Sequence, residues 1–120
     1  MVANKEISKK AIEIVEEYEK RYGAKVQIAN KMSGYDIISI RSNETRKIEV
    51  KGTRKKKPNE GFILNSQEEF NNLENGGYIY RVIDVFGKPE IIELTKDDVE
   101  TIKEPRWRLK IKRGIDASLL

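Results

Sequence analysis

The chain has 120 residues, of which 38% are apolar and 37% charged, and a formal net charge of +4. We expect a single domain over residues 1–120, with its core at about 6–94 and a C-terminal extension at 95–120. The chain contains neither cysteine nor histidine, which excludes disulfides, thiolate zinc sites and histidine-based catalysis.

A helix is the first predicted element, over residues 6–22. Its apolar residues recur with the spacing of one helix face: Ile7, Ala11, Ile14, Val15, Tyr18 and Tyr22. Gly23 follows and suits the C-terminal cap. A short strand is expected at 25–28, and Ser33-Gly34 indicates a turn.

Two stretches rich in Ile and Val, at 35–40 and 47–51, predict a β-hairpin, with polar residues 42–45 between them. The stretch that follows, 52–61, has almost no apolar residue and is expected to be an exposed loop.

After a short strand at 62–64, Ser66 and Glu69 match a capping box, which predicts a helix to about residue 73. Strands are expected at 78–86 and 90–94, with Tyr78, Tyr80 and Phe86 of the first packing within the sheet.

Thr95 and Asp98 resemble a second cap, which predicts a short helix over 97–102. Apolar and basic residues alternate over 106–112, as in a strand with one basic face. The order of elements predicts an α+β or α/β fold, in which helices flank a mixed central sheet and extra strands follow at the C-terminus.

Candidate functional residues lie on the predicted hairpin. Glu49 and Lys51 share one face of their strand because side chains alternate. A turn centred between Ser42 and Asn43 places Asp36 opposite Glu49, whereas a turn centred between Asn43 and Glu44 places it opposite Lys51. Either register gathers the three side chains in one patch. Paired carboxylates suit a hard divalent ion such as Mg²⁺, and a nearby lysine can orient a water molecule, which together suffice for phosphodiester hydrolysis.

These residues resemble the motif of the PD-(D/E)XK nuclease superfamily, which has a restriction-endonuclease-like fold with an αβββαβ core. Within it, Gly-Tyr-Asp-Ile at 34–37 and Ile-Glu-Val-Lys-Gly at 48–52 look most like NO VEIN C-terminal-like domains. The resemblance implies Asp36 and Glu49 as metal ligands for Mg²⁺ or Mn²⁺, the Val50 carbonyl as a further ligand, and Lys51 beside the attacking water.

The chain departs from the family pattern in its helices. Many members carry an acidic residue in the first helix, where this chain has Ile12. Glu19 flanks the apolar stripe of the helix most closely and is therefore the candidate for that accessory role. Gln67 matches a functional glutamine of some branches, but the tyrosine expected four residues later is Asn71.

Charge is unevenly distributed along the chain. Residues 41–57 hold eight basic and two acidic residues, a balance of +6, whereas 65–104 hold four basic and ten acidic, a balance of −6. The basic run follows the candidate lysine closely and is either a solvated loop or a contact for a phosphate backbone: Arg54, Lys55, Lys56 and Lys57. The later basic residues of 106–113 either protect a sheet edge or contact nucleic acid.

The function expected from these features is Mg²⁺-dependent hydrolysis of DNA. The alternatives are a catalytically inactive nuclease-like module that binds DNA or a protein, and a plain interaction domain. Family resemblance suggests a homodimer, and a chain this short would need an associated subunit for sequence specificity. No apolar run approaches the roughly 20 residues of a membrane span, and no signal peptide is evident, so we expect a cytoplasmic protein without a membrane partner.

Overall fold

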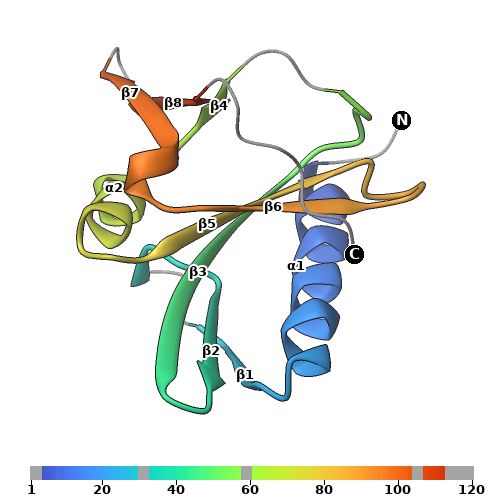
Figure 1. The fold of residues 1–120 in the computed structure, drawn as a ribbon. Helices are drawn as coiled ribbons and strands as arrows, with labels where there is room; N and C mark the ends of the chain where they lie inside the picture. The colour runs from blue at the N-terminus through green and yellow to red at the C-terminus, as the bar shows by residue number, and fades with distance from the viewer. Residues whose placement is uncertain (1–3, 30–32, 58–60, 104–106, 113–120) are drawn as a thin grey trace.

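The computed structural model describes residues 4–29, 33–57, 61–103 and 107–112. The fold is α+β, with a mixed five-stranded sheet, two α-helices and a smaller three-stranded sheet (Figure 1). None of the helices in these ranges has the length and apolarity to cross a membrane.

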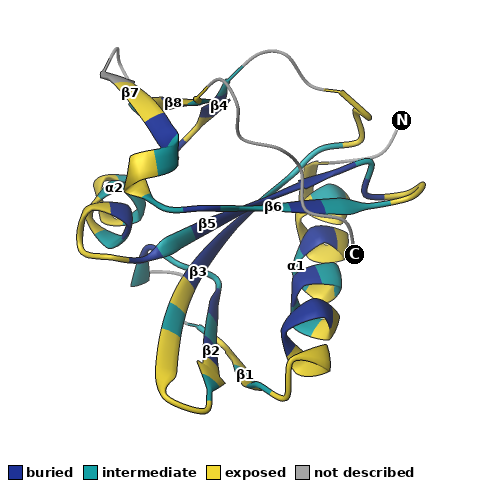
Figure 2. Ribbon diagram, viewed as in Figure 1, coloured by how far each residue is buried: buried dark blue, intermediate teal, exposed yellow. Residues whose placement is uncertain are grey.

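Helix α1 (Asn4–Arg21) covers one face of the large sheet. Its predicted apolar stripe is buried at Ala11, Val15 and Tyr18, which pack in the same cluster as Ile37 and Val50 of the sheet. The buried side of α1 therefore faces the strands, while its exposed side faces solvent (Figure 2).

The large sheet has the order β1-β2-β3-β5-β6. Its strands are β1 (Lys25–Ile28), β2 (Ile37–Arg41), β3 (Glu44–Gly52), β5 (Tyr78–Ile83) and β6 (Glu90–Leu94). Only β3 and β5 run parallel, while the other neighbours are antiparallel. In the β2–β3 hairpin Ile37 pairs with Ile48 and Arg41 with Glu44, which confirms the register with its turn centred between Ser42 and Asn43.

The small sheet has the order β4-β8-β7, from β4 (Phe62–Ile63), β8 (Trp107–Ile111) and β7 (Val99–Lys103). Helix α2 (Gln67–Glu74) lies beside it, and the two share a second apolar cluster with Leu73 and Leu109 at its centre. Phe70 of α2 stacks on Trp107, with ring centroids 3.8 Å apart.

The helix predicted over 97–102 is wrong. The cap at Thr95 forms, because the Asp98 carboxylate accepts hydrogen bonds from the Thr95 amide and hydroxyl at 2.8 and 3.1 Å. However, it opens only a 3₁₀ turn, η2 (Lys96–Asp98), and the chain then pairs as β7 with β8. Val99 and Thr101 are β-branched and favour a strand. Strand β8 thus lies between β7 and β4, and it is covered by β4 at Arg108 and Leu109; Arg106 and Arg113 lie outside the described residues.

Candidate functional site

Asp36 lies immediately before β2 and is tied to β3 by two hydrogen bonds. Its amide donates to the Ile48 carbonyl, and its carboxylate accepts from the Val50 amide, both at 2.8 Å. These bonds fix the side chain against β3, so the aspartate predicted from hairpin spacing reaches its partners.

Glu49 and Lys51 project from the same face of β3, as strand alternation requires. Glu49 is only 5% exposed, and the Lys51 ammonium lies 3.2 Å from its carboxylate. Burial, followed by hydrogen bonding and charge repulsion from Asp36, raises the pKa of Glu49 to about 10. Glu49 therefore favours its protonated form in the folded protein.

Glu69 is a further member of this group that sequence reasoning assigned only to a helix cap. Its carboxylate accepts a hydrogen bond from the Asn65 amide at 3.0 Å and lies 2.8 Å from the Lys51 ammonium. The Ser66 hydroxyl accepts from the Glu69 amide at 3.2 Å, so the predicted cap is also present. The capping-box spacing was the available signal, but it does not reveal which way the carboxylate faces.

A cleft of about 480 Å³ joins these four side chains. Its walls come from the first turns of α1, from β4 and from the end of β3. The other lining residues are Asn4, Ile7, Ser8, Ile12, Val50, Gly52, Thr53, Phe62, Ile63, Asn65 and Arg81. Ile12 lines the cleft at the helix position where the family resemblance led us to look for an acidic residue.

Two glycines allow this close assembly. Gly34 has a φ of +81°, and a Cβ there would lie 2.3 Å from the Glu68 carbonyl oxygen, so the segment before Asp36 packs directly on α2. A Cβ on Gly52 would lie 2.7 Å from the Ala11 Cβ, so α1 packs directly on the end of β3. Side chains at either position would push a wall of the cleft outward.

Arg81 forms the basic side of the cleft. It is buried, donates to the Lys51 carbonyl at 3.1 Å and places its guanidinium 5.1 Å from the centre of the Phe62 ring. The cleft thus contains cations as well as carboxylates.

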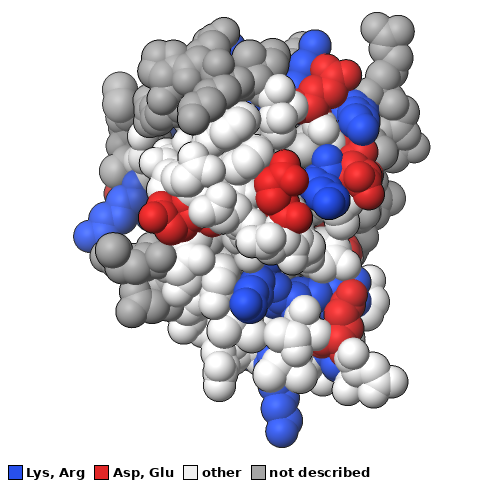
Figure 3. All heavy atoms as spheres, turned by 90° about the vertical axis from the view of Figure 1, so that its left-hand side faces the viewer, with Lys and Arg blue, Asp and Glu red and all other residues white. Residues whose placement is uncertain are grey.

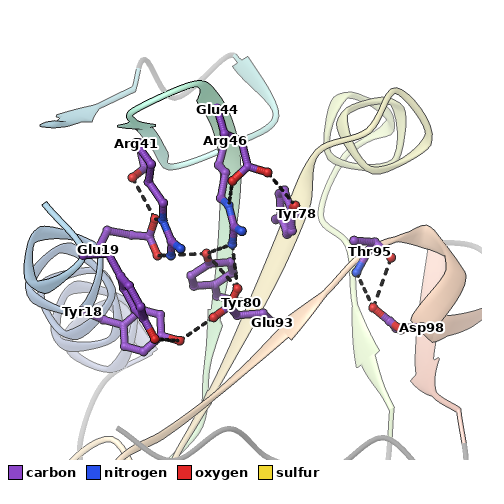
Figure 4. A network of polar contacts seen from close by, with 12 residues as sticks. Tyr18, Glu19, Arg41, Glu44, Arg46, Tyr78, Tyr80, Glu93, Thr95 and Asp98 are labelled. Carbon is purple, nitrogen blue, oxygen red and sulfur yellow. Dashed lines mark hydrogen bonds and ion pairs between the residues drawn. The ribbon is translucent and has the colours of Figure 1, made fainter. Parts of the chain in front are cut away.

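Glu19 does not join the cleft. It is fully buried toward the C-terminal end of α1, where it accepts hydrogen bonds from Ser39 at 2.8 Å, from Arg41 at 2.9 Å and from Tyr80 at 2.9 Å (Figure 4). Burial opposes ionisation, but the bonds from Arg41, Ser39 and Tyr80 outweigh it and lower the pKa of Glu19. The same network continues through Tyr80 to Arg46 and Glu93, at 2.8 and 2.6 Å between successive polar atoms.

Gln67 is also outside the cleft lining. It is exposed, donates from its side-chain amide to the Asn71 Oδ1 at 3.1 Å and accepts from the Trp107 indole at 3.3 Å. These contacts link α2 to the small sheet, which gives Gln67 a local structural role.

The basic segment, defined here as residues 54–57, is exposed and begins directly after Thr53 of the cleft lining. Three of the other basic residues of 41–57 form ion pairs: Arg41 with Glu19, Arg46 with Glu44 and Glu93, and Lys51 with Glu49 and Glu69. The fourth, Lys47, places its ammonium 5.5 Å from the centre of the Tyr35 ring. On the face in Figure 3, Lys and Arg are intermixed with Asp and Glu. The four residues of the segment are therefore the concentrated positive charge nearest the cleft.

Within the described part of the chain, no group of three or more acidic side chains is arranged to hold a metal ion. The residues that could bind a divalent ion are instead Asp36 and Glu49. Their carboxyl groups lie close together, and this proximity adds to the effect of burial in raising the pKa of Glu49. A cation would relieve the same repulsion as the proton. Mg²⁺ accepts one or two carboxylates and retains several waters, so these donors suit it.

Comparison with known proteins identifies the family. A family described as "Protein NO VEIN, C-terminal" matches residues 7–95, which is most of the chain. The chain belongs to this family. A search of curated proteins found no match. The matched range includes most of α1, the large sheet and α2, and with them Asp36, Glu49, Lys51 and Glu69.

Proposed function

We propose that this member of the NO VEIN C-terminal family is a Mg²⁺-dependent nuclease with a restriction-endonuclease-like core of the PD-(D/E)XK type, acting on DNA phosphodiester bonds. One observation carries the proposal: Asp36, Glu49 and Lys51 meet in a single cleft at the end of β3. The adjoining basic segment supplies charge of the sign that a phosphate backbone requires.

Asp36 and Glu49 would hold the Mg²⁺ or Mn²⁺ ion, together with the Val50 carbonyl. When bound, such an ion polarises a phosphoryl oxygen and acidifies a coordinated water. The Val50 amide keeps the Asp36 carboxylate in place at 2.8 Å, and burial keeps bulk water away from Glu49.

Lys51 would orient the attacking water and stabilise the negative charge that develops on phosphorus-bound oxygen. Glu69 positions this ammonium at 2.8 Å and keeps it at the cleft. Because the Glu69 carboxylate is itself held by the Asn65 amide, the lysine is anchored through α2 as well as through its own strand.

A catalytically inactive module that binds DNA or a protein is the second candidate, and one observation favours it. Glu49 favours its protonated form, Lys51 pairs with Glu69, and Arg81 adds a further cation, so the charges in the cleft are largely balanced without metal. A module of this kind would bind DNA through the basic segment with no dependence on divalent ions.

Incubation with supercoiled plasmid separates the two candidates. The nuclease predicts nicking that requires Mg²⁺ or Mn²⁺ and is abolished by Asp36→Asn and by Lys51→Ala. Lys47→Ala is the matched control, because Lys47 lies on the same face of β3 but does not line the cleft. Absence of metal-dependent nicking, or equal nicking by all variants, would contradict the proposal.

A further inference from the structure

Phe86 occupies the turn between β5 and β6 and is 50% exposed, so its predicted packing within the sheet is wrong. The turn is held by Asp84, whose φ is +52°. Asp84 accepts the Gly87 amide on its carbonyl and the Lys88 amide on its carboxylate, both at 3.0 Å. An ordered turn therefore presents the aromatic ring to solvent.

Backbone hydrogen bonds place this turn beside the basic segment. The Thr53 amide donates to the Val82 carbonyl at 2.9 Å, and the Thr53 carbonyl accepts from the Val85 amide at 3.1 Å. The Lys55 carbonyl then accepts from the Asp84 amide at 2.9 Å. Residues 53–57 and the β5–β6 turn accordingly lie side by side in Figure 1.

We propose that Phe86 and the basic segment form a binding site for unpaired nucleotides, a reading that rests on the proposed nuclease function for the identity of its substrate. An exposed aromatic ring stacks on a free base, while neighbouring cations contact the phosphates. Thr53 belongs both to this assembly and to the cleft lining. A strand held at Phe86 would thus run toward Asp36 and Lys51.

The site selects single-stranded over fully paired nucleic acid. In a duplex both faces of an internal base are already stacked, so the Phe86 ring has nothing to stack on there. Phe86 also belongs to neither described core cluster, so its exposed ring is available to a ligand.

The test measures binding without cleavage, by fluorescence anisotropy of labelled oligonucleotides in EDTA. Phe86→Ala should weaken binding of a single strand about tenfold, which corresponds to ~1.4 kcal/mol, and leave duplex binding within about twofold. Phe86→Trp should retain the affinity. Ile28→Ala is the matched control, because Ile28 is also exposed but lies on edge strand β1.

A base analogue reports on stacking directly. The fluorescence of 2-aminopurine in the single strand should be quenched by the native protein and by Phe86→Trp, but not by Phe86→Ala. Equal single-strand affinity of the native protein and Phe86→Ala, or a Phe86 dependence seen only with phosphatidylserine vesicles, would overturn the site. If the protein nicks plasmid but Phe86→Ala does not change binding of the single strand, only the binding site at Phe86 is refuted. If binding depends on Phe86 but the protein does not nick plasmid, only the nuclease function is refuted.

Discussion

Replacement of Glu49 by glutamine tests the electrostatics of the cleft through protein stability. In the folded protein burial and Asp36 raise the pKa of Glu49 to about 10, whereas an unfolded glutamate titrates near its ordinary value of about 4.3. Between these values the folded state keeps a proton that the unfolded state has lost. Stability therefore falls as pH rises through this window, by up to ~1.4 kcal/mol per pH unit.

Glutamine resembles the protonated carboxyl group in shape but does not titrate. Between pH 5.5 and 7.5 the native protein should lose up to about 3 kcal/mol more stability than Glu49→Gln. Urea unfolding in EDTA at several pH values, followed by circular dichroism, measures the difference. Glu68→Gln is the control, because Glu68 is exposed and outside the cleft lining. Saturating Mg²⁺ should reduce the difference between the native protein and Glu49→Gln in how steeply stability falls with pH, because the cation replaces the proton on Glu49.

If the free energy of unfolding changes with pH equally in the native protein and in Glu49→Gln, this account of the cleft is refuted. That result would mean that Glu49 is ionised in the folded state and that Lys51 alone compensates it. The crowding that makes a cation favourable would then be absent.

Two further substitutions probe the supports of the cleft, and a third probes the buried network around Glu19. Gly52→Ala should cost about 1–3 kcal/mol in urea unfolding, because its methyl group would overlap α1; unchanged stability would contradict this packing. Glu19→Gln should cost about 3 kcal/mol by weakening the pairing of Arg41, and a loss well under 1 kcal/mol would show that the buried pair contributes little. Glu69→Gln should slow metal-dependent nicking about 10- to 100-fold through the lysine it positions, and an unaltered rate would remove Glu69 from the site.

The hairpin could be predicted because its determinants are local. Alternation of apolar residues fixed which side chains share a face, and the short connection at Ser42 left only two registers to consider. The structure selects the one that places Asp36 opposite Glu49. The β1 and β6 boundaries were also predicted correctly, since polar or glycine-containing turns delimit both strands.

The errors arose where tertiary pairing decides the outcome. The cap at Thr95 is real, but pairing with β8 determines that β7 follows it. Phe86 continues a β-rich stretch in the sequence, yet Asp84 turns the chain before it. The roles of Glu69 and Glu19 could not be predicted for the same reason. Their ion-pair partners, Lys51 and Arg41, are 18 and 22 residues away in sequence.

The most direct test of whether the Asp36 and Glu49 carboxyl groups bind a divalent cation is a titration of the protein with Mn²⁺. Binding is measured as the loss of the electron paramagnetic resonance signal of the free ion. The account predicts saturable binding that Asp36→Asn and Glu49→Gln each abolish and that Lys51→Ala retains. Failure of the native protein to bind Mn²⁺, or binding by either carboxylate variant that equals that of the native protein, would contradict it.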